Sequence, residues 1–202
     1  MFNLTNVKTT LIHTLCITGV LFLATSCTQN KTLDSKKVAE RENLAKMTSD
    51  DFNVVIVKSE NDAKFLVEAA EMQLEMISLG KLAQKKGTIS HVKEMGIKME
   101  EEHGKSFSEL QLLARSKSIS IPTTITHDSQ EAWDKLNKKS GKDFDQAYSK
   151  LMVDSHEDAI DMFEKNSEES KDQEIRAWAN KSLPVLRSHL QHAKTSKRVV
   201  TN

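Results

Sequence analysis

Apolar side chains recur at intervals of three and four residues along four long stretches of this chain. This spacing places them on one face of an α-helix, and we expect helices at residues 61–86, 90–117, 143–166 and 172–197. The 202 residues include 6 Gly and 2 Pro, whereas an all-β or α/β chain would need many more turn-forming residues. The sequence therefore predicts an all-α protein.

Residues at the expected helix ends support these ranges. Ser59, followed three residues later by Asp62, is typical of a helix N-terminus, and Gly87 is typical of a helix C-terminus. A short extra helix is expected at residues 130–139, in the connection between the second and third long helices. Pro184 falls inside the fourth long helix, where it should kink the helix or shift it by one turn.

The connections predict how the helices are arranged. Short loops make successive helices antiparallel neighbours, which is the plan of a four-helix bundle. Only the second connection, around Pro122, is long enough to cross from one end of the bundle to the other. We therefore expect an antiparallel four-helix bundle over residues 60–197, with the short extra helix in its second connection.

The 3-4 spacing also predicts which residues face the core. The inward stripes of the four long helices, in chain order, are Phe65, Ala69, Met72, Met76, Leu79 and Ala83; Val92, Gly96, Met99, His103, Ser106, Leu110 and Leu113; Ser149, Met152, His156, Ala159 and Phe163; and Ile175, Ala179, Ser182, Leu186, His189 and Ala193.

Three of these stripes each contain one histidine at a similar depth. His103 and His156 lie about 13 residues from their helix starts, or about 20 Å at 1.5 Å per residue, and His189 lies about 17 residues in. Glu75 is also near the middle of its helix, on the flank of the stripe. The four side chains are therefore expected in one layer near the middle of the bundle.

Two interpretations of this layer remain open. Three imidazoles and a carboxylate suit one transition-metal ion (Zn, Fe, Mn or Cu), with Glu100 as a further ligand. Methionines on the same stripes could add soft ligands for copper. In the other interpretation the histidines form a polar core layer, satisfied by Glu75, Ser106 or water, that specifies the helix register.

The first 26 residues are expected to be a lipoprotein signal peptide. They carry one charge, Lys8, and a mixed apolar run over 11–24 that is short for a permanent membrane span. Residues 23–27 resemble a bacterial lipobox, in which small residues precede a cysteine that becomes acylated. The alternatives are an ordinary signal peptide cleaved nearby or an uncleaved anchor.

Cleavage at this site would leave Cys27 as the N-terminal, lipid-bearing residue. Residues 27–59 are mostly polar and are expected to form a tether between the lipid and the bundle. The sequence thus predicts a lipoprotein of the bacterial cell envelope that is anchored in a membrane, with the periplasmic side of the outer membrane as the expected location. Cys16 would be removed, so no disulfide within the chain is expected.

Composition and motifs argue against several function classes. The chain has 29 basic and 29 acidic residues, and this balance gives no electrostatic footprint for nucleic acid. It contains no glycine-rich phosphate loop and no nucleophile elbow. No catalytic or organic-cofactor-binding residue is predicted, so an enzyme is not the expected class. The sequence does not identify a protein partner.

Short motifs spread along the chain resemble the bacterial family catalogued as domain of unknown function 4142. The resemblance covers residues 61–194, and its motifs are Glu75-Met76-x-x-Leu79-Gly80, Met99-x-x-x-His103, Ile121-Pro122, Phe144-Asp145-x-x-Tyr148 and Leu183-Pro184-x-Leu186-x-x-His189-Leu190. Members look like exported proteins, often described as putative outer-membrane or periplasmic proteins, and the family is grouped with ferritin-like folds. The resemblance implies a ferritin-like bundle and no particular reaction.

The di-iron pattern of ferritin-like proteins is incomplete here. Glu100-x-x-His103 matches one of the two Glu-x-x-His motifs of such proteins. The fourth helix has Leu186 where the second carboxylate should stand, and the third helix has His156 where a glutamate is expected. Di-iron chemistry is therefore not expected.

Two hypotheses from different classes follow. In the first, the protein is an anchored bundle whose inner layer binds a transition metal for storage, buffering or delivery. In the second, it is a non-catalytic structural or envelope-stress protein that acts through partner contacts on its surface.

Overall fold

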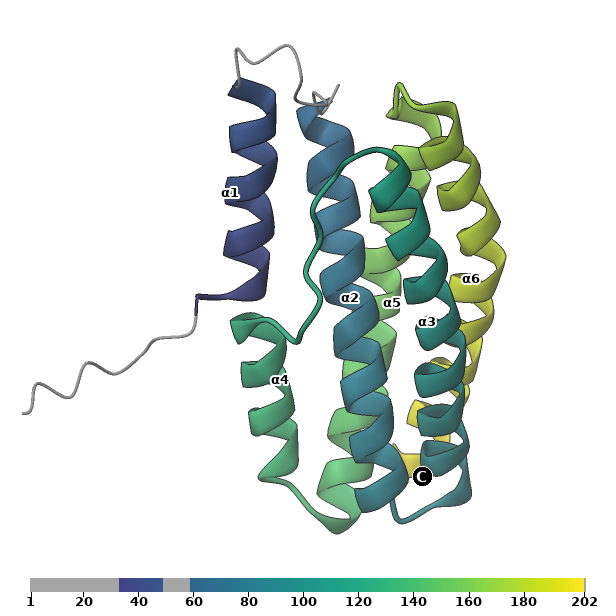
Figure 1. The fold of residues 1–202 in the computed structure, drawn as a ribbon. Coiled ribbons are helices and arrows are strands. Elements are labelled where there is room, and N and C mark those ends of the chain that lie inside the picture. The colour runs from purple at the N-terminus through teal and green to yellow at the C-terminus, as the bar shows by residue number, and fades with distance from the viewer. Residues whose placement is uncertain (1–32, 49–58, 202) are drawn as a thin grey trace, which may run out of the picture. The chain divides into compact units, whose positions relative to one another are not determined.

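The described part of the chain is entirely helical. The computed structural model describes residues 33–48 and 59–201, and it contains no strand within those ranges (Figure 1). Its helices are α1 (Ser35–Thr48), α2 (Glu60–Lys86), α3 (Ser90–Ser116), α4 (His127–Asn137), α5 (Gly141–Glu169) and α6 (Gln173–Thr201). Across the described ranges, no helix combines the length and the apolar character needed to cross a membrane.

The four predicted long helices correspond to α2, α3, α5 and α6, and the predicted short helix corresponds to α4. The all-α prediction is thus confirmed. Pro184 lies inside α6, and the helix continues through it to Thr201. The predicted signal peptide, the predicted lipidation site at Cys27 and residues 28–32 and 49–58 of the predicted tether lie outside the described residues.

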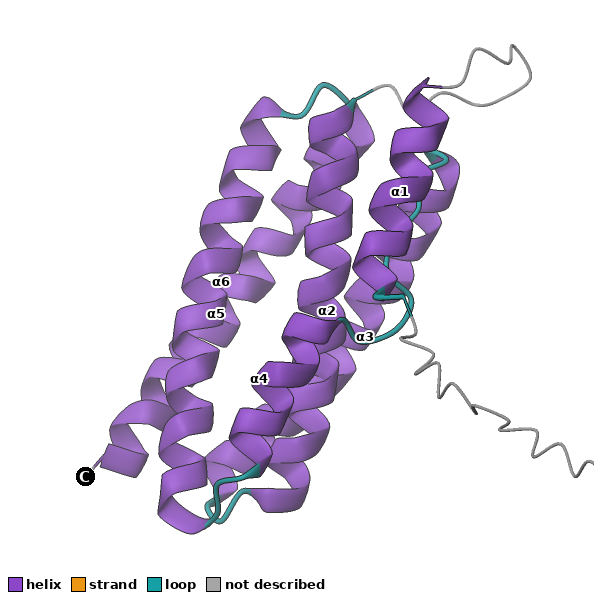
Figure 2. Cartoon of the chain, turned by 90° about the vertical axis from the view of Figure 1, so that its left-hand side faces the viewer, coloured by secondary structure: helices purple, strands orange, loops and turns teal. Residues whose placement is uncertain are grey.

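The long helices form two hairpins, α2 with α3 and α5 with α6. Each hairpin is closed by a short loop, at residues 87–89 and 170–172. Figures 1 and 2 show the four long helices side by side. The first loop is fastened to α5, because the buried carboxylate of Asp145 accepts hydrogen bonds from the backbone N–H (3.0 Å) and the hydroxyl of Thr88.

Both predicted ends of α2 are confirmed in position. The Ser59 hydroxyl accepts a hydrogen bond from the backbone N–H of Asp62 at 3.2 Å. Gly87 follows the last helical residue with φ of −56°, so it does not adopt the left-handed conformation expected of a glycine stop. Only glycine fits at this position, because a Cβ atom would lie 2.7 Å from the Ala83 carbonyl oxygen and 2.8 Å from Val92.

α2 and α3 approach each other at two glycines. A Cβ atom on Gly80 would lie 2.6 Å from the carbonyl oxygen of Gly96, and one on Gly96 would lie 2.7 Å from that of Gly80. Real Cβ atoms do not approach this closely, so backbone packs directly on backbone at this crossing. The contact aligns α3 against α2 and leaves no room for a side chain between them.

The core consists of two apolar clusters. In one, the rings of Phe65, Phe163 and Trp178 pack with centroids 5.2–5.9 Å apart. The other includes Phe144 and Tyr148, whose rings stack. Along each helix the stripe histidine lies between residues of the two clusters, so the histidine layer separates them. The predicted stripes are inward, and most of their side chains are fully buried.

α1 and α4 lie along one side of α2 (Figures 1 and 2). Residues 27–59 were expected to be a tether, but α1 within them is packed on the domain. The Asn43 side chain is buried and exchanges two hydrogen bonds, of 2.7 and 2.8 Å, with the backbone of Ser120 in the α3–α4 connection. Lys36 forms an ion pair of 2.6 Å with Glu71 of α2.

Candidate metal centre

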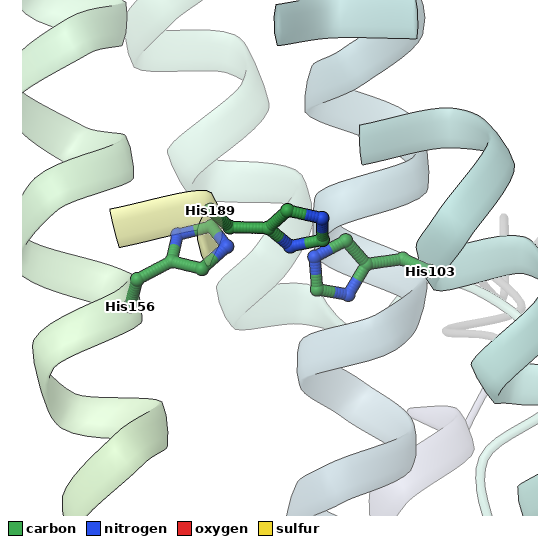
Figure 3. A group of neighbouring side chains, drawn as sticks. All are labelled: His103, His156 and His189. Carbon is green, nitrogen blue, oxygen red and sulfur yellow. The ribbon is translucent and has the colours of Figure 1, made fainter. Parts of the chain in front are cut away.

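Three histidines from three helices converge between the two apolar clusters. His103 of α3, His156 of α5 and His189 of α6 point their rings toward one another (Figure 3). One nitrogen from each ring lies within 4.8 Å of the nitrogens of the other two. The side chains are buried, and their ring centroids are 5.0–5.6 Å apart. The three histidines thus lie in one layer, as their depth along the helices predicted, and the structure shows that their rings also converge.

Each ring uses its other nitrogen for one hydrogen bond. His156 Nδ1 lies 2.7 Å from the carbonyl oxygen of Met152, and His189 Nε2 lies 2.9 Å from a carboxylate oxygen of Glu102. Both partners can only accept, so each of these ring nitrogens carries the hydrogen and donates it. The remaining nitrogen of each neutral ring then presents a lone pair.

The hydrogen-bond partner of His103 is Gln73 of α2. Its Nδ1 lies 2.6 Å from Oε1 of the buried Gln73, whose amide nitrogen donates to the Ser106 hydroxyl at 3.0 Å. Since the amide nitrogen of Gln73 is the donor to Ser106, its oxygen accepts from His103 Nδ1. Nε2 of His103 therefore also carries a lone pair, and the ring is held in one orientation.

The three lone-pair nitrogens have no hydrogen-bond partner in the described part of the chain. They are Nε2 of His103, Nε2 of His156 and Nδ1 of His189, and all three are buried. Three buried acceptors on converging rings therefore lack a donor within the described residues. Leaving a buried polar atom unsatisfied costs about 1–3 kcal/mol, so this layer is unfavourable as a purely structural arrangement.

Burial keeps the three rings neutral. It lowers the pKa of His103 well below its ordinary value, assisted by His189 and His156, and it lowers the pKa of His156 to about 4. Burial also lowers the pKa of His189, and the opposing effect of Glu102 does not fully offset it. Neutral imidazole is the form that binds a metal ion, so the site is prepared for binding at neutral pH.

Two carboxylates proposed from the sequence lie outside this group. Glu75 faces α4, where it accepts a hydrogen bond of 3.0 Å from the Ser129 hydroxyl, and burial raises its pKa. Glu100 faces α2, where it accepts a 2.6 Å hydrogen bond from Gln84. Periodicity placed Glu75 near the layer by depth, but its direction around the helix turns it away from the histidines.

Sequence reasoning missed two residues that orient the rings, Gln73 and Glu102. Gln73 is four residues after Ala69 and three before Met76, so its spacing places a polar side chain on the inward stripe of α2. This spacing could have identified it as a partner of the histidines. Glu102 belongs to a run of three glutamates on α3, and periodicity alone does not tell which of them reaches α6.

A pocket of about 250 Å³ lies beside the histidines, between α3 and α6. His103 and His189 border it, whereas His156 does not. Gln73 and Ser106 also line it, and Glu102 stands on its wall. The candidate metal centre is thus adjacent to an opening on one side of the helices.

The comparisons with known proteins concern the family and the fold of the chain. The model of the family described as domain of unknown function (DUF4142) matches residues 56–195, which is more than half of the chain. The chain belongs to this family. The resemblance noted in the sequence is thereby confirmed, and the family description assigns no activity.

The chain is also similar to a solved structure, the crystal structure of a DUF305 fragment from Deinococcus radiodurans. The two share 10% sequence identity with a TM-score of 0.59, and the match covers 71% of this chain and 97% of the fragment. At this identity the likeness concerns the fold alone. A search of curated proteins found no match to the chain.

Proposed function

We propose that this protein binds one transition-metal ion through His103, His156 and His189. The observation that carries the proposal is the set of three buried lone pairs without a donor, on three rings whose nitrogens approach one another within 4.8 Å. Metal–nitrogen bonds are about 2.0–2.1 Å long. Nitrogens within 4.8 Å of one another can therefore share a single ion after small movements of the rings.

The surroundings of the rings support binding over a purely structural layer. Metal-ligating histidines almost always donate their second N–H to a carboxylate, a backbone carbonyl or another oxygen. Here Glu102, the Met152 carbonyl and Gln73 provide these acceptors in turn. A structural polar layer would instead be expected to pair its nitrogens with one another or with nearby donors.

The ligand set favours zinc or copper over manganese or iron. Imidazole nitrogen suits Zn²⁺ and copper, whereas carboxylate-rich sets suit Mn²⁺ and di-iron centres. Within the described residues, no carboxylate lies in the group of three histidines. The proposed role is non-catalytic: the ion is cargo that the protein stores, buffers or delivers.

We also infer the finer architecture and location. The two hairpins and their short loops support a ferritin-like antiparallel four-helix bundle.

Residues 1–27 support export and acylation at Cys27, which would anchor the protein at the periplasmic face of the outer membrane. Mass spectrometry of the membrane fraction should find a lipid-modified N-terminal Cys27. A Cys27→Ser chain that remains lipid-modified and membrane-bound would contradict this location.

The metal site is tested by titration of the purified chain in a Cys16→Ser, Cys27→Ser background, in which no thiol competes for the ion. Elemental analysis and calorimetry with Zn, Cu, Fe and Mn should give one ion of zinc or copper per chain. Thermal unfolding should shift upward with bound ion. His156→Ala should abolish both effects while circular dichroism still reports helix.

His192→Ala is the matched control for this experiment. His192 lies three residues after His189 on the same helix, and its side chain is exposed. It should bind the ion as the unmodified chain does. Absence of tight binding, or binding that His156→Ala leaves unchanged, would overturn the site and favour the hypothesis of a structural protein acting through surface contacts.

A further inference from the structure

The proposed ligand atoms are closed off from solvent. Each of the three lone-pair nitrogens is buried, and the rings that carry them are almost fully buried as well. The two apolar clusters lie on either side of the layer along the helix axes. An ion that reaches these nitrogens therefore has to pass between two helices rather than along the core.

The pocket between α3 and α6 is the opening that leads toward the layer. It borders the rings of His103 and His189. The uncharged polar side chains of its lining are Gln73, Ser106 and Ser182, which can replace part of the water shell of a passing cation. Two lysines, Lys105 and Lys181, also line it, together with two glutamates. Its apolar wall includes Val185, whose side chain is 42% exposed and is therefore accessible from the surface.

Two carboxylates flank the pocket at different heights. Glu109 of α3 is joined to Lys181 of α6 by a 2.8 Å ion pair. Glu102 of α3 is partly exposed, and the same carboxylate accepts the hydrogen bond from His189. Glu102 thus connects the pocket surface to one of the proposed ligands, where a carboxylate can attract a cation before the imidazoles receive it.

The opposite side of α3 is closely packed at its crossing with α2. There Gly80 and Gly96 bring the backbones of α2 and α3 into direct contact. α5 and α6 pack on each other along their length as the second hairpin. The seam between α3 and α6 is joined by polar side chains across a pocket, so it can separate with less loss of close packing than the α2–α3 crossing.

We propose that the pocket between α3 and α6 is the passage through which the metal ion enters and leaves, with Glu102 as its first binding group. This inference rests on the proposed function and extends it, because a site with its own passage exchanges its ion. Such exchange fits a protein that buffers or delivers a metal, as opposed to one that holds a permanent structural ion.

The test is to block the passage without touching a proposed ligand. Val185→Trp places a large side chain at the pocket wall. Val199→Trp is the matched control, because Val199 is on the same helix, is 41% exposed and does not line the pocket. Stopped-flow mixing with Zn²⁺ measures uptake, and mixing the loaded chain with a chelator measures release. Both variants are made in the Cys16→Ser, Cys27→Ser background.

Val185→Trp should slow uptake and release alike, by about tenfold or more, which corresponds to about 1.4 kcal/mol in the barrier. The equilibrium Kd should stay within about threefold of the unmodified chain, because a blocked passage changes both rates together. Val199→Trp should leave both rates unchanged. Equal rates in Val185→Trp and the unmodified chain would overturn the passage while leaving the metal site intact.

A second design avoids any effect on folding. In the Cys16→Ser, Cys27→Ser background, Val185→Cys is purified without metal and then modified with a bulky maleimide, and Val199→Cys is treated in the same way. Slower exchange only after labelling at 185 supports the passage, and equal exchange at both labelled positions overturns it. An unmodified chain that takes up no ion in either experiment overturns both the metal site and the passage.

Discussion

α3 packs against two neighbours in two different ways. Toward α2 it presents Gly96, which meets Gly80 at a distance that no side chain could occupy. Toward α6 it presents Glu102 and Glu109, which reach His189 and Lys181 across a pocket of about 250 Å³. One side of the helix is therefore fastened by backbone contact, and the other is bridged by long polar side chains.

On its α2 side, α3 is held by close packing, and on its α6 side it borders the pocket that we propose as the passage for the ion. Direct backbone contact leaves no space and tolerates no added atoms. Polar bridges exchange readily with water, and their net contribution at a surface is small. Two of the three proposed ligands, His103 and His189, border the pocket on the second side.

The largest expected effect comes from acid acting on the histidine layer. Burial holds the folded-state pKa of His156 at about 4, below its unfolded value of about 6.5, so the unfolded chain binds the proton first as pH falls. The free energy of unfolding of the metal-free protein should decrease between pH 6.5 and 4, by about 3 kcal/mol from His156 alone. Urea unfolding across this range measures the loss.

His156→Leu should flatten this dependence, because leucine has no proton to bind. His192→Ala should keep it, since His192 is exposed. If His156→Leu loses stability with falling pH as steeply as the parent chain, His156 is not a source of the acid sensitivity.

The close contact between α2 and α3 gives the next largest effect. Gly96→Ala places a methyl group 2.7 Å from the Gly80 carbonyl oxygen. The resulting separation of the helices should lower the free energy of unfolding by about 1–3 kcal/mol. Gly104→Ala lies on the same helix with nothing within 4 Å of its Cβ position, and it should instead raise stability by up to about 1 kcal/mol.

Chemical denaturation of both glycine variants separates packing from helix propensity. A loss at Gly104 equal to that at Gly96 would mean that the glycines matter for some reason other than the crossing.

A smaller effect is expected at Glu102, on the open side of α3. Glu102→Gln keeps an acceptor for His189 but removes the charge that strengthens the hydrogen bond. Metal affinity should fall about tenfold or more, as for other partners of metal-bound histidines. Calorimetric titration measures the change, with Glu101→Gln as the control on the exposed neighbouring position. An unchanged Kd would show that Glu102 does not support the ligand.

The smallest effect is expected at the ion pair between Lys181 and Glu109, which joins α6 to α3 beside the pocket. Lys181 and Glu109 form an ion pair between an exposed lysine and a partly exposed glutamate side chain. Lys181→Ala should change the free energy of unfolding by less than about 0.5 kcal/mol. Thermal unfolding at low and high salt measures it, and a larger loss would show that this bridge, and not the α2–α3 contact, holds α3 in place.

Sequence reasoning predicted the helices and the depth of the histidines well, because both depend on spacing along one helix. The same reasoning did not predict which neighbouring helix each side chain beside the inward stripe would contact. Gln73 and Glu75 are two residues apart, or about 200° around the helix. Gln73 therefore reaches His103, whereas Glu75 reaches Ser129 of α4.

The sequence by itself determined the helical class and the inward position of His103, His156 and His189, because helical periodicity is a local property of the chain. Only the tertiary structure decided the rest. The rotation and stagger of α3 against α6 brought Glu102 to His189 and left a pocket beside it. Those contacts join residues distant in sequence, and they depend on how complete helices pack, which no local pattern specifies.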